Sequence, residues 1–133
     1  MGRHEQREQI FMLLFRVEFY GIEERNEQIT LFFQDEERLN ISEKDVVYIT
    51  EKYHKIEQLL PELDKKIDEK AEGWKVDRMG KVELTVLRLA LYEILKDKEV
   101  PNSVAINEAV EIAKKYGQQT SGGFVNAVLA KFV

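Results

Sequence analysis

Basic and glycine-rich residues near the C-terminus are the groups in this sequence best suited to bind an anion. The last 22 residues contain no acidic side chain, whereas Lys114, Lys115 and Lys131 are positively charged. Gly122 and Gly123 precede an apolar stretch and would open a helix, leaving its first backbone N–H groups unobstructed. Such groups can hold a phosphate. The alternative is that the two glycines only let the chain turn between closely packed helices.

Two arginines near the N-terminus form a second candidate anion-binding group. At about 100° per residue of helix, Arg3 and Arg7 lie close together on one side of the first predicted helix. Glu5 and Glu8 lie on the other side. Guanidinium groups gathered in this way bind phosphate in a bidentate manner or stack on a base. Phe11 follows on the arginine side as a possible stacking platform, although an aromatic residue at this spacing is more often part of a core.

Residues that would support catalysis or metal binding are sparse. The sequence has no cysteine, and His4 and His54 stand fifty positions apart. His4 begins a stretch that resembles a zinc-protease helix, but Glu8 occupies the position of the second histidine, so the ligand set is incomplete. The clustered carboxylates fall in predicted turns and helix ends, where nothing would raise a pKa for acid–base chemistry. We therefore predict no enzyme activity, no metal site and no cofactor.

The net charge of −5 is unevenly distributed over the 133 residues. Residues 1–73 carry a balance of −7, and residues 74–133 carry +2. Overall acidity argues against indiscriminate binding to nucleic acid, whereas the unevenness leaves room for a local basic surface. The sequence has neither about 18 continuous apolar residues nor a secretory signal, so we predict a soluble, cytoplasmic protein.

The elements that must position these groups are all helical. No segment alternates apolar and polar residues for long enough to form a strand. We expect a compact bundle of about seven helices in one domain, with an N-terminal sub-bundle over residues 1–73 and a C-terminal sub-bundle over residues 74–133. Gly73 and Trp74 would form the joint.

Capping residues and prolines predict the boundaries of the first four helices. The first should run from about residue 4 to about residue 20, and a shorter one should follow around Ile29. Ser42 resembles the start of a capping box for the third. Pro61 is expected in the first turn of the fourth, where a proline is tolerated.

Similar signals predict the remaining helices. Asp77 is expected to cap a central helix over residues 79–95, which is apolar on most sides. Pro101 should start the penultimate helix. Thr120 or Ser121 should cap the last one.

Several motifs resemble the NusB family of bacterial transcription antitermination factors, and the resemblance covers the entire chain. The most specific are Ile-Asn-Glu-Ala-Val-Glu-Ile-Ala-Lys at residues 106–114 and Phe-Val-Asn at residues 124–126. Further matching positions are Arg3, Arg7, Glu8, Leu13, Leu14, Phe15, Trp74, Arg78, Val82, Glu83, Leu87, Arg88, Leu89, Ala90, Tyr92, Glu93, Val100 and Pro101.

This resemblance implies an RNA-binding adapter. The family pairs with the small-subunit ribosomal protein NusE to bind the single-stranded boxA element of a transcript. The pair then acts in the RNA polymerase antitermination complex, notably on ribosomal RNA operons. Carried over by position, the resemblance implies RNA contacts at Arg3, His4 and Arg7 and in the loop from Gln118 to Phe124, where the candidates are Gln119, Thr120, Ser121, Gly123 and Phe124. Lys114 is a further RNA-binding candidate because of its charge in the basic C-terminal segment. The resemblance also implies NusE contacts at Arg78 and Glu83, with Trp74 either in the core or at that interface.

Two departures from the family pattern affect the expected RNA affinity. The N-terminus has only Arg3 and Arg7, separated by Glu5, where many members have consecutive arginines, and Ala127 replaces the usual glycine after Phe-Val-Asn. We therefore expect weak RNA binding by the isolated chain, which NusE would offset by adding a second RNA surface. The interpretation requires the N-terminal arginines and the final inter-helix turn to share one surface. The alternative is a self-associating, protein-binding helical module, in which a homodimer would mask that surface.

Overall fold

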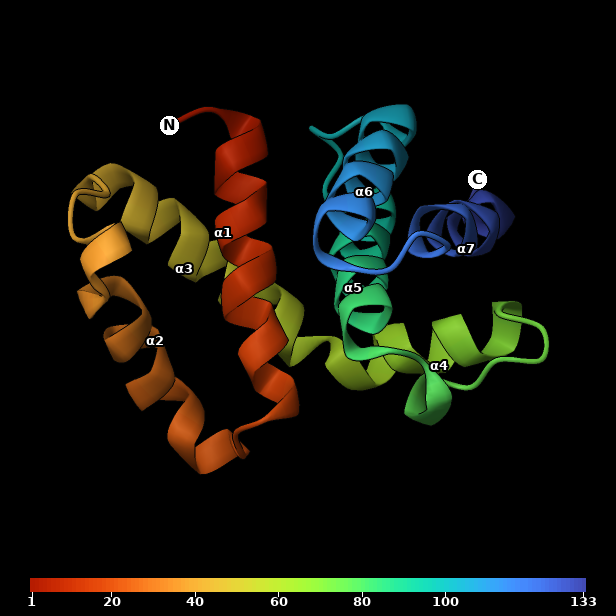
Figure 1. The fold of residues 1–133 in the computed structure, drawn as a ribbon, viewed down its shortest axis with the longest axis horizontal. Helices are drawn as coiled ribbons and strands as arrows, with labels where there is room; N and C mark the ends of the chain where they lie inside the picture. The colour runs from red at the N-terminus through yellow and green to blue at the C-terminus, as the bar shows by residue number, and fades with distance from the viewer. The chain divides into compact units, whose positions relative to one another are not determined.

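The chain folds entirely into helices, as the computed structural model of residues 1–133 shows (Figure 1). The seven α-helices are α1 (Arg3–Phe15), α2 (Arg25–Gln34), α3 (Glu43–Gln58), α4 (Leu60–Lys70), α5 (Lys81–Lys96), α6 (Asn102–Tyr116) and α7 (Ser121–Leu129). Short 3-10 turns complete the structure: η1 (Arg16–Glu18), η2 (Ile22–Glu24), η3 (Glu36–Arg38), η4 (Val76–Arg78) and η5 (Ala130–Phe132). The all-α fold with seven helices is therefore confirmed. No helix is long and apolar enough to traverse a lipid bilayer.

The chain divides into two compact units, residues 1–57 and 58–133. The division falls at the end of α3 instead of near residue 73, where the sequence placed it, because α4 packs against α5. Arg88 of α5 donates from Nε to Asp64 Oδ1 at 2.8 Å and from Nη2 to Asp64 Oδ2 at 2.7 Å. This bidentate pair fastens α4 to the second unit.

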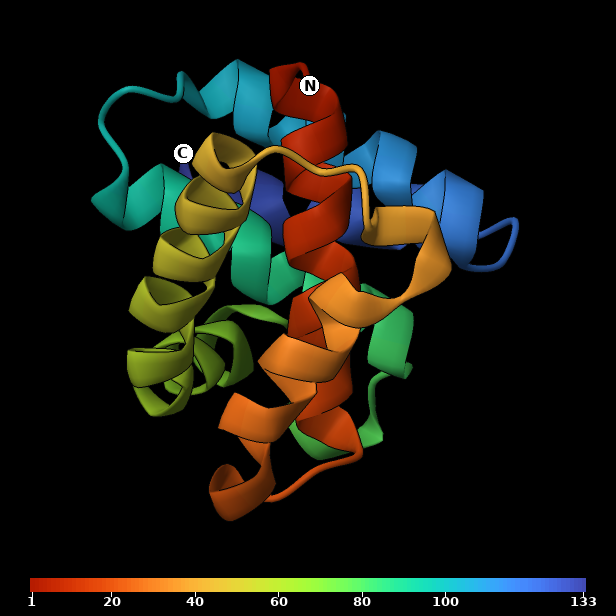
Figure 2. The same ribbon diagram turned by 90° about the vertical axis from the view of Figure 1, so that its left-hand side faces the viewer.

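In the first unit α2 folds back beside α1, and α3 crosses α1 obliquely on another side (Figure 1 and Figure 2). Its core consists of large apolar side chains from all three helices, namely Ile10, Phe11, Leu13, Leu14, Phe32, Ile49, Tyr53 and Ile56. Burying each of the aliphatic ones contributes about 1.5–3 kcal/mol. The guanidinium groups of Arg16 and Arg38 lie 5.1 Å and 3.9 Å from the ring centroid of Phe32.

The start of α3 is fastened to the start of α1. The Ser42 hydroxyl accepts the backbone N–H of Asp45 at 3.2 Å, which confirms Ser42 as the cap, and donates to Asp45 Oδ2 at 3.0 Å. The Asp45 carboxylate also accepts from the Gln6 side chain at 2.9 Å and from the amine of Met1 at 3.1 Å. These hydrogen bonds, led by the one from Gln6, hold the pKa of Asp45 below its ordinary value.

In the second unit α5 is the central helix. It packs against α4, α6 and α7, and it runs opposite to α6 (Figure 1). Ten successive residues, 84–93, are buried. The prediction of a central helix that is apolar on most sides is thereby confirmed.

Several helix ends differ from the prediction. The first helix stops at Phe15 instead of about residue 20 because the chain tightens into η1. Asp77 does not cap the central helix, since it lies within η4, and Gly80 occupies the N-cap position with an extended backbone. Pro61 does lie in the first turn of α4. Thr120 occupies the N-cap position of α7, but its side chain makes no capping hydrogen bond.

Candidate functional site

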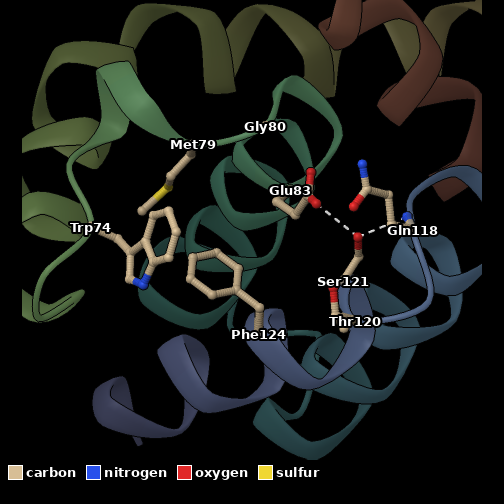
Figure 3. A pocket seen from close by; sticks show the side chains of 8 residues that line it. All are labelled: Trp74, Met79, Gly80, Glu83, Gln118, Thr120, Ser121 and Phe124. Carbon is tan, nitrogen blue, oxygen red and sulfur yellow. Dashed lines mark hydrogen bonds between the residues drawn. The ribbon is translucent and has the colours of Figure 1, made fainter.

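A pocket of about 350 Å³ opens in the second unit between the start of α5 and the segment that joins α6 to α7 (Figure 3). Its lining side chains are Trp74, Met79, Gly80, Glu83, Gln118, Thr120, Ser121 and Phe124. The sequence assigned Thr120, Ser121 and Phe124 to RNA contact and Glu83 to partner contact. The pocket therefore brings members of both predicted sets into one place.

The polar end of the pocket is a short hydrogen-bonded chain. The Ser121 hydroxyl donates to Glu83 Oε1 at 2.7 Å and accepts the backbone N–H of Gln118 at 2.9 Å (Figure 3). Ser121 is only 1% exposed. Its hydroxyl is thus committed inside the protein, and the prediction that Ser121 contacts RNA directly does not fit this placement.

The apolar end of the pocket is formed by aromatic rings. Trp74 and Phe124 meet nearly edge to face, with ring centroids 5.8 Å apart and an interplanar angle of 75°. Met79 is buried beside them, whereas Trp74 is 53% exposed. Trp74 was expected either in the core or at the partner interface, and its exposure excludes a place in the core. Exposed aromatic rings beside convergent polar groups are typical of a binding site.

The two glycines that open α7 have different surroundings. A Cβ on Gly122 would lie 3.1 Å from Cγ and 3.3 Å from Cε of Lys114, so the stem of this lysine packs closely over Gly122. The close-packing explanation thus applies to Gly122. A Cβ on Gly123 would meet nothing within 4 Å, and Gly123 is exposed. The phosphate-binding explanation stays a prediction for Gly123.

The C-terminal lysines are not equally available. Lys131 donates to the carbonyl oxygen of Lys70 at 3.0 Å, and its ammonium lies 3.9 Å from the Glu72 carboxylate. Although residues 112–133 contain no acidic side chain, Lys131 thus lies beside an acidic residue that is distant in sequence. Lys115 lies 5.4 Å from the ring centroid of Tyr116. Lys114, on α6, is exposed, and its side chain packs against Gly122 at the start of α7.

The N-terminal candidates also divide into exposed and buried groups. Arg3 is exposed and donates from Nη1 to the Tyr48 hydroxyl at 3.1 Å. His4 is exposed, with Nε2 3.6 Å from Glu8 Oε2. Arg7, in contrast, is only 6% exposed. The prediction that Arg7 joins Arg3 in an anion-binding group therefore does not fit the burial of Arg7.

The predicted sorting of arginines from acids on α1 stays a prediction. Arg7 and Glu8 are adjacent in sequence and both buried. Periodicity placed Arg7 at the edge of the apolar stripe, and in the folded chain this edge is buried. Phe11 is a core residue, 3% exposed, with its ring centroid 6.1 Å from that of Phe15.

The partner candidates lie on either side of Gly80. Arg78 is exposed at the end of η4, and Glu83 is half-buried in the first turn of α5. Nowhere in the chain is a group of three or more His, Cys, Asp or Glu side chains placed to hold a metal ion.

Comparison with known proteins shows which family shares this sequence. The profile of the NusB family matches residues 4–133. The chain belongs to the NusB family. It is 50% identical over 132 residues to the transcription antitermination protein NusB of Agathobacter rectalis, with 99% of both chains covered. It is 44% identical over 133 residues to that of Lachnoclostridium phytofermentans, covering 100% of this chain and 99% of the relative.

Solved NusB structures share the fold. The T. maritima NusB structure is 33% identical and superposes with a TM-score of 0.82, covering 98% of this chain and 89% of that one. A crystal structure of the antitermination factors NusB and NusE in complex with dsRNA matches with a TM-score of 0.82 at 25% identity, covering 98% and 96%. The resemblance to NusB found in the sequence is therefore confirmed.

Sequence reasoning missed two features of the site. The Trp74–Phe124 ring contact and the Glu83–Ser121 hydrogen bond each join residues far apart along the chain. Periodicity and capping rules act over one or two helical turns, so they carry no signal for such pairs. Only the glycine content near these positions hinted at close approaches.

Proposed function

We propose that this protein is an RNA-binding transcription antitermination factor that pairs with NusE to bind boxA-type single-stranded RNA. In the RNA polymerase antitermination complex it promotes processive transcription of ribosomal RNA operons. The observation that carries this proposal is the match to the NusB family over residues 4–133. Further support comes from the likeness to the NusB chain solved with NusE and dsRNA. The protein acts in the cytoplasm as one RNA-binding domain and catalyses no reaction.

Direct RNA contact is assigned to those predicted residues that the structure leaves accessible. They are Arg3, His4, Lys114, Gln119, Thr120, Gly123 and the half-buried Phe124. Exposed cations and backbone N–H groups suit phosphates, and an accessible aromatic ring suits a base. Arg7 and Ser121 are buried, so no direct RNA contact is assigned to them.

The NusE surface is assigned to Arg78 and Glu83. Arg78 is exposed, so its guanidinium is open to a carboxylate of the partner. Glu83 is half-buried, and its Oε1 is already hydrogen-bonded to Ser121. The exposed Trp74 would supply apolar contact beside them, because it lines the same pocket as Glu83.

A binding titration tests the proposal. Labelled boxA-type RNA and a scrambled RNA of equal length are titrated with the protein, with and without NusE. We expect a preference for the boxA strand that is strongest with NusE, and a modest salt slope of about 0.7 per phosphate contact. Equal affinity for both RNAs in both settings would count decisively against the proposal.

A self-associating helical module is the alternative function. It is favoured by large apolar side chains exposed on the first unit, namely Phe19, Ile22 and Leu39. Sedimentation velocity at several protein concentrations, with and without RNA, separates the two functions. A tight dimer that RNA does not dissociate would support the alternative.

A further inference from the structure

The loop between α6 and α7, residues 117–120, is tied to α5 by one serine. The Ser121 hydroxyl accepts a hydrogen bond from the backbone N–H of Gln118, in the loop, at 2.9 Å. It donates a hydrogen bond to the Glu83 carboxylate, on α5, at 2.7 Å. Hydrogen bonds to a charged acceptor contribute more than those between neutral groups. The conformation of the loop therefore depends on where α5 holds the Glu83 carboxylate.

Two glycines make room for this hydrogen bond. A Cβ on Gly80 would lie 2.5 Å from Glu83 Oε2, and a Cβ on Gly117 would lie 2.6 Å from Ser121 Oγ. Glu83 and Ser121 thus occupy space that a side chain at position 80 or 117 would take up. Gly117 is the stricter of the two, because its Cβ would also lie 2.7 Å from the carbonyl oxygen of Ala113.

We propose that Glu83 and Ser121 are positioning residues that hold the α6–α7 loop in its RNA-binding conformation and couple it to the NusE surface. The inference rests on the proposed function. Glu83 belongs to the surface assigned to NusE, and Gln119 and Thr120 of the loop belong to the surface assigned to RNA. A partner that holds the Glu83 carboxylate in its present place stabilises the loop, and RNA bound to the loop strengthens NusE binding by the same factor.

The sign of the effect separates positioning from simple electrostatics. Glu83 is a negative charge at the rim of the surface assigned to RNA. If it acted by charge alone, its removal would tighten RNA binding, because repulsion over less than a Debye length would disappear. If it positions the loop, its removal weakens RNA binding in spite of the lost repulsion.

The experiment measures RNA affinity of the isolated full-length chain at one fixed salt concentration. Ser121→Ala and Glu83→Ala each weaken boxA-type RNA binding by about three- to tenfold. The double variant is no weaker than either single variant, because both remove the same hydrogen bond. Glu83→Gln keeps an acceptor oxygen and binds at least as tightly as the unsubstituted protein. Glu111→Ala is the charge control: it removes an exposed carboxylate of α6 and does not weaken binding.

A second set of measurements guards against loss of folding. Helix content and melting temperature are recorded for every variant, and amide exchange should accelerate at Gln118 in Ser121→Ala while the core of α5 stays protected. Gly80→Ala displaces the Glu83 carboxylate and leaves both hydrogen-bonding residues in the sequence. It should weaken RNA binding by no more than Glu83→Ala does, because the flexible Glu83 side chain can shift in response.

The coupling is measured as the factor by which NusE raises RNA affinity. We expect this factor to fall in Ser121→Ala, whereas RNA contacts made by NusE itself remain. Unchanged RNA affinity in folded Ser121→Ala, tighter binding by Glu83→Ala, or an unchanged NusE factor would overturn the inference. These outcomes differ from the one that would refute the proposed function, in which the unsubstituted protein shows no preference for boxA-type RNA.

Discussion

Trp74 and Phe124 meet nearly edge to face although fifty positions separate them in the chain, and their ring centroids lie 5.8 Å apart. One ring precedes α5 and the other lies in the first turn of α7, so the contact joins the two sides of the pocket. Trp74 is also the only tryptophan of the protein. Its fluorescence therefore reports on this pocket alone.

Phe124→Ala should change both the fluorescence and the RNA binding. Loss of the neighbouring ring exposes Trp74 further to water, so its emission should shift to longer wavelength in the free protein. Loss of a base-stacking ring should weaken RNA binding by about 1–3 kcal/mol. Phe132→Ala, a half-buried phenylalanine of the same unit, is the control. A Phe124→Ala variant with the RNA affinity of the unsubstituted protein would remove Phe124 from the RNA surface.

Arg3→Ala should lower RNA affinity with little loss of stability, because its hydrogen bond to the Tyr48 hydroxyl is exposed. Arg3 is exposed, so its loss removes about one phosphate contact and reduces the salt slope by about 0.7. Lys55→Ala removes an exposed cation from α3 of the same unit and should leave the slope unchanged. The measurement is RNA affinity at four or more salt concentrations. Equal slopes for the two variants would exclude a phosphate contact by Arg3.

Arg88→Ala should destabilise the protein strongly. The bidentate pair with Asp64 is partly buried, and removing one partner of a buried ion pair costs about 3–5 kcal/mol of unfolding free energy. Lys96→Ala is a matched control, because Lys96 also links α5 to α4 but through an exposed contact of 3.8 Å with Glu62. Its cost should stay below about 1 kcal/mol. Urea denaturation measures both, and similar values would refute this account of how α4 is held.

Asp45 should give the protein an acid-sensitive contribution to stability. Its pKa is lowered in the folded state from an ordinary value of 3.8, first by the hydrogen bond from Gln6. A lowered pKa stabilises the fold fully above 3.8, and the contribution is lost as the pH falls through the folded-state pKa. Asp45→Asn should therefore melt at a lower temperature than the unsubstituted protein at pH 6, and the difference should shrink below about pH 4.

Glu43→Gln is the control for that pH series. Glu43 is exposed in the first turn of the same helix and should leave the pH dependence of the melting temperature unchanged. If Asp45→Asn and the unsubstituted protein kept a constant difference in melting temperature from pH 6 to pH 2, the carboxylate would not be the source of the effect.

The number and type of helices were predictable because their signals are local. Ser42 caps α3 and Pro61 lies in the first turn of α4, and both effects act within one helical turn. Asp77 carried the same kind of signal and failed as a cap. Residues 76–78 form a 3-10 turn, and the backbone becomes helical only after Gly80.

The candidate site was only partly predictable. The resemblance to NusB pointed to the α6–α7 loop and to the start of α5, which together line the pocket. It did not predict which individual side chains are buried. Arg7 and Ser121 were expected at the surface and are buried, because tertiary packing and not helical periodicity decides which edge of a stripe is covered. The boundary between the two units after α3 likewise depends on the Arg88–Asp64 ion pair, which no local sequence pattern predicts.

The two arginines beside Phe32 affect how strongly this part of the first unit attracts a polyanion. Arg16 and Arg38 direct their charge toward a ring with no exposed surface. The acidic side chains of the neighbouring turns, Glu23, Glu24, Glu36 and Glu37, face the solvent. Under the proposed function, these carboxylates would repel a transcript at the turns and so favour its approach from the Arg3 end.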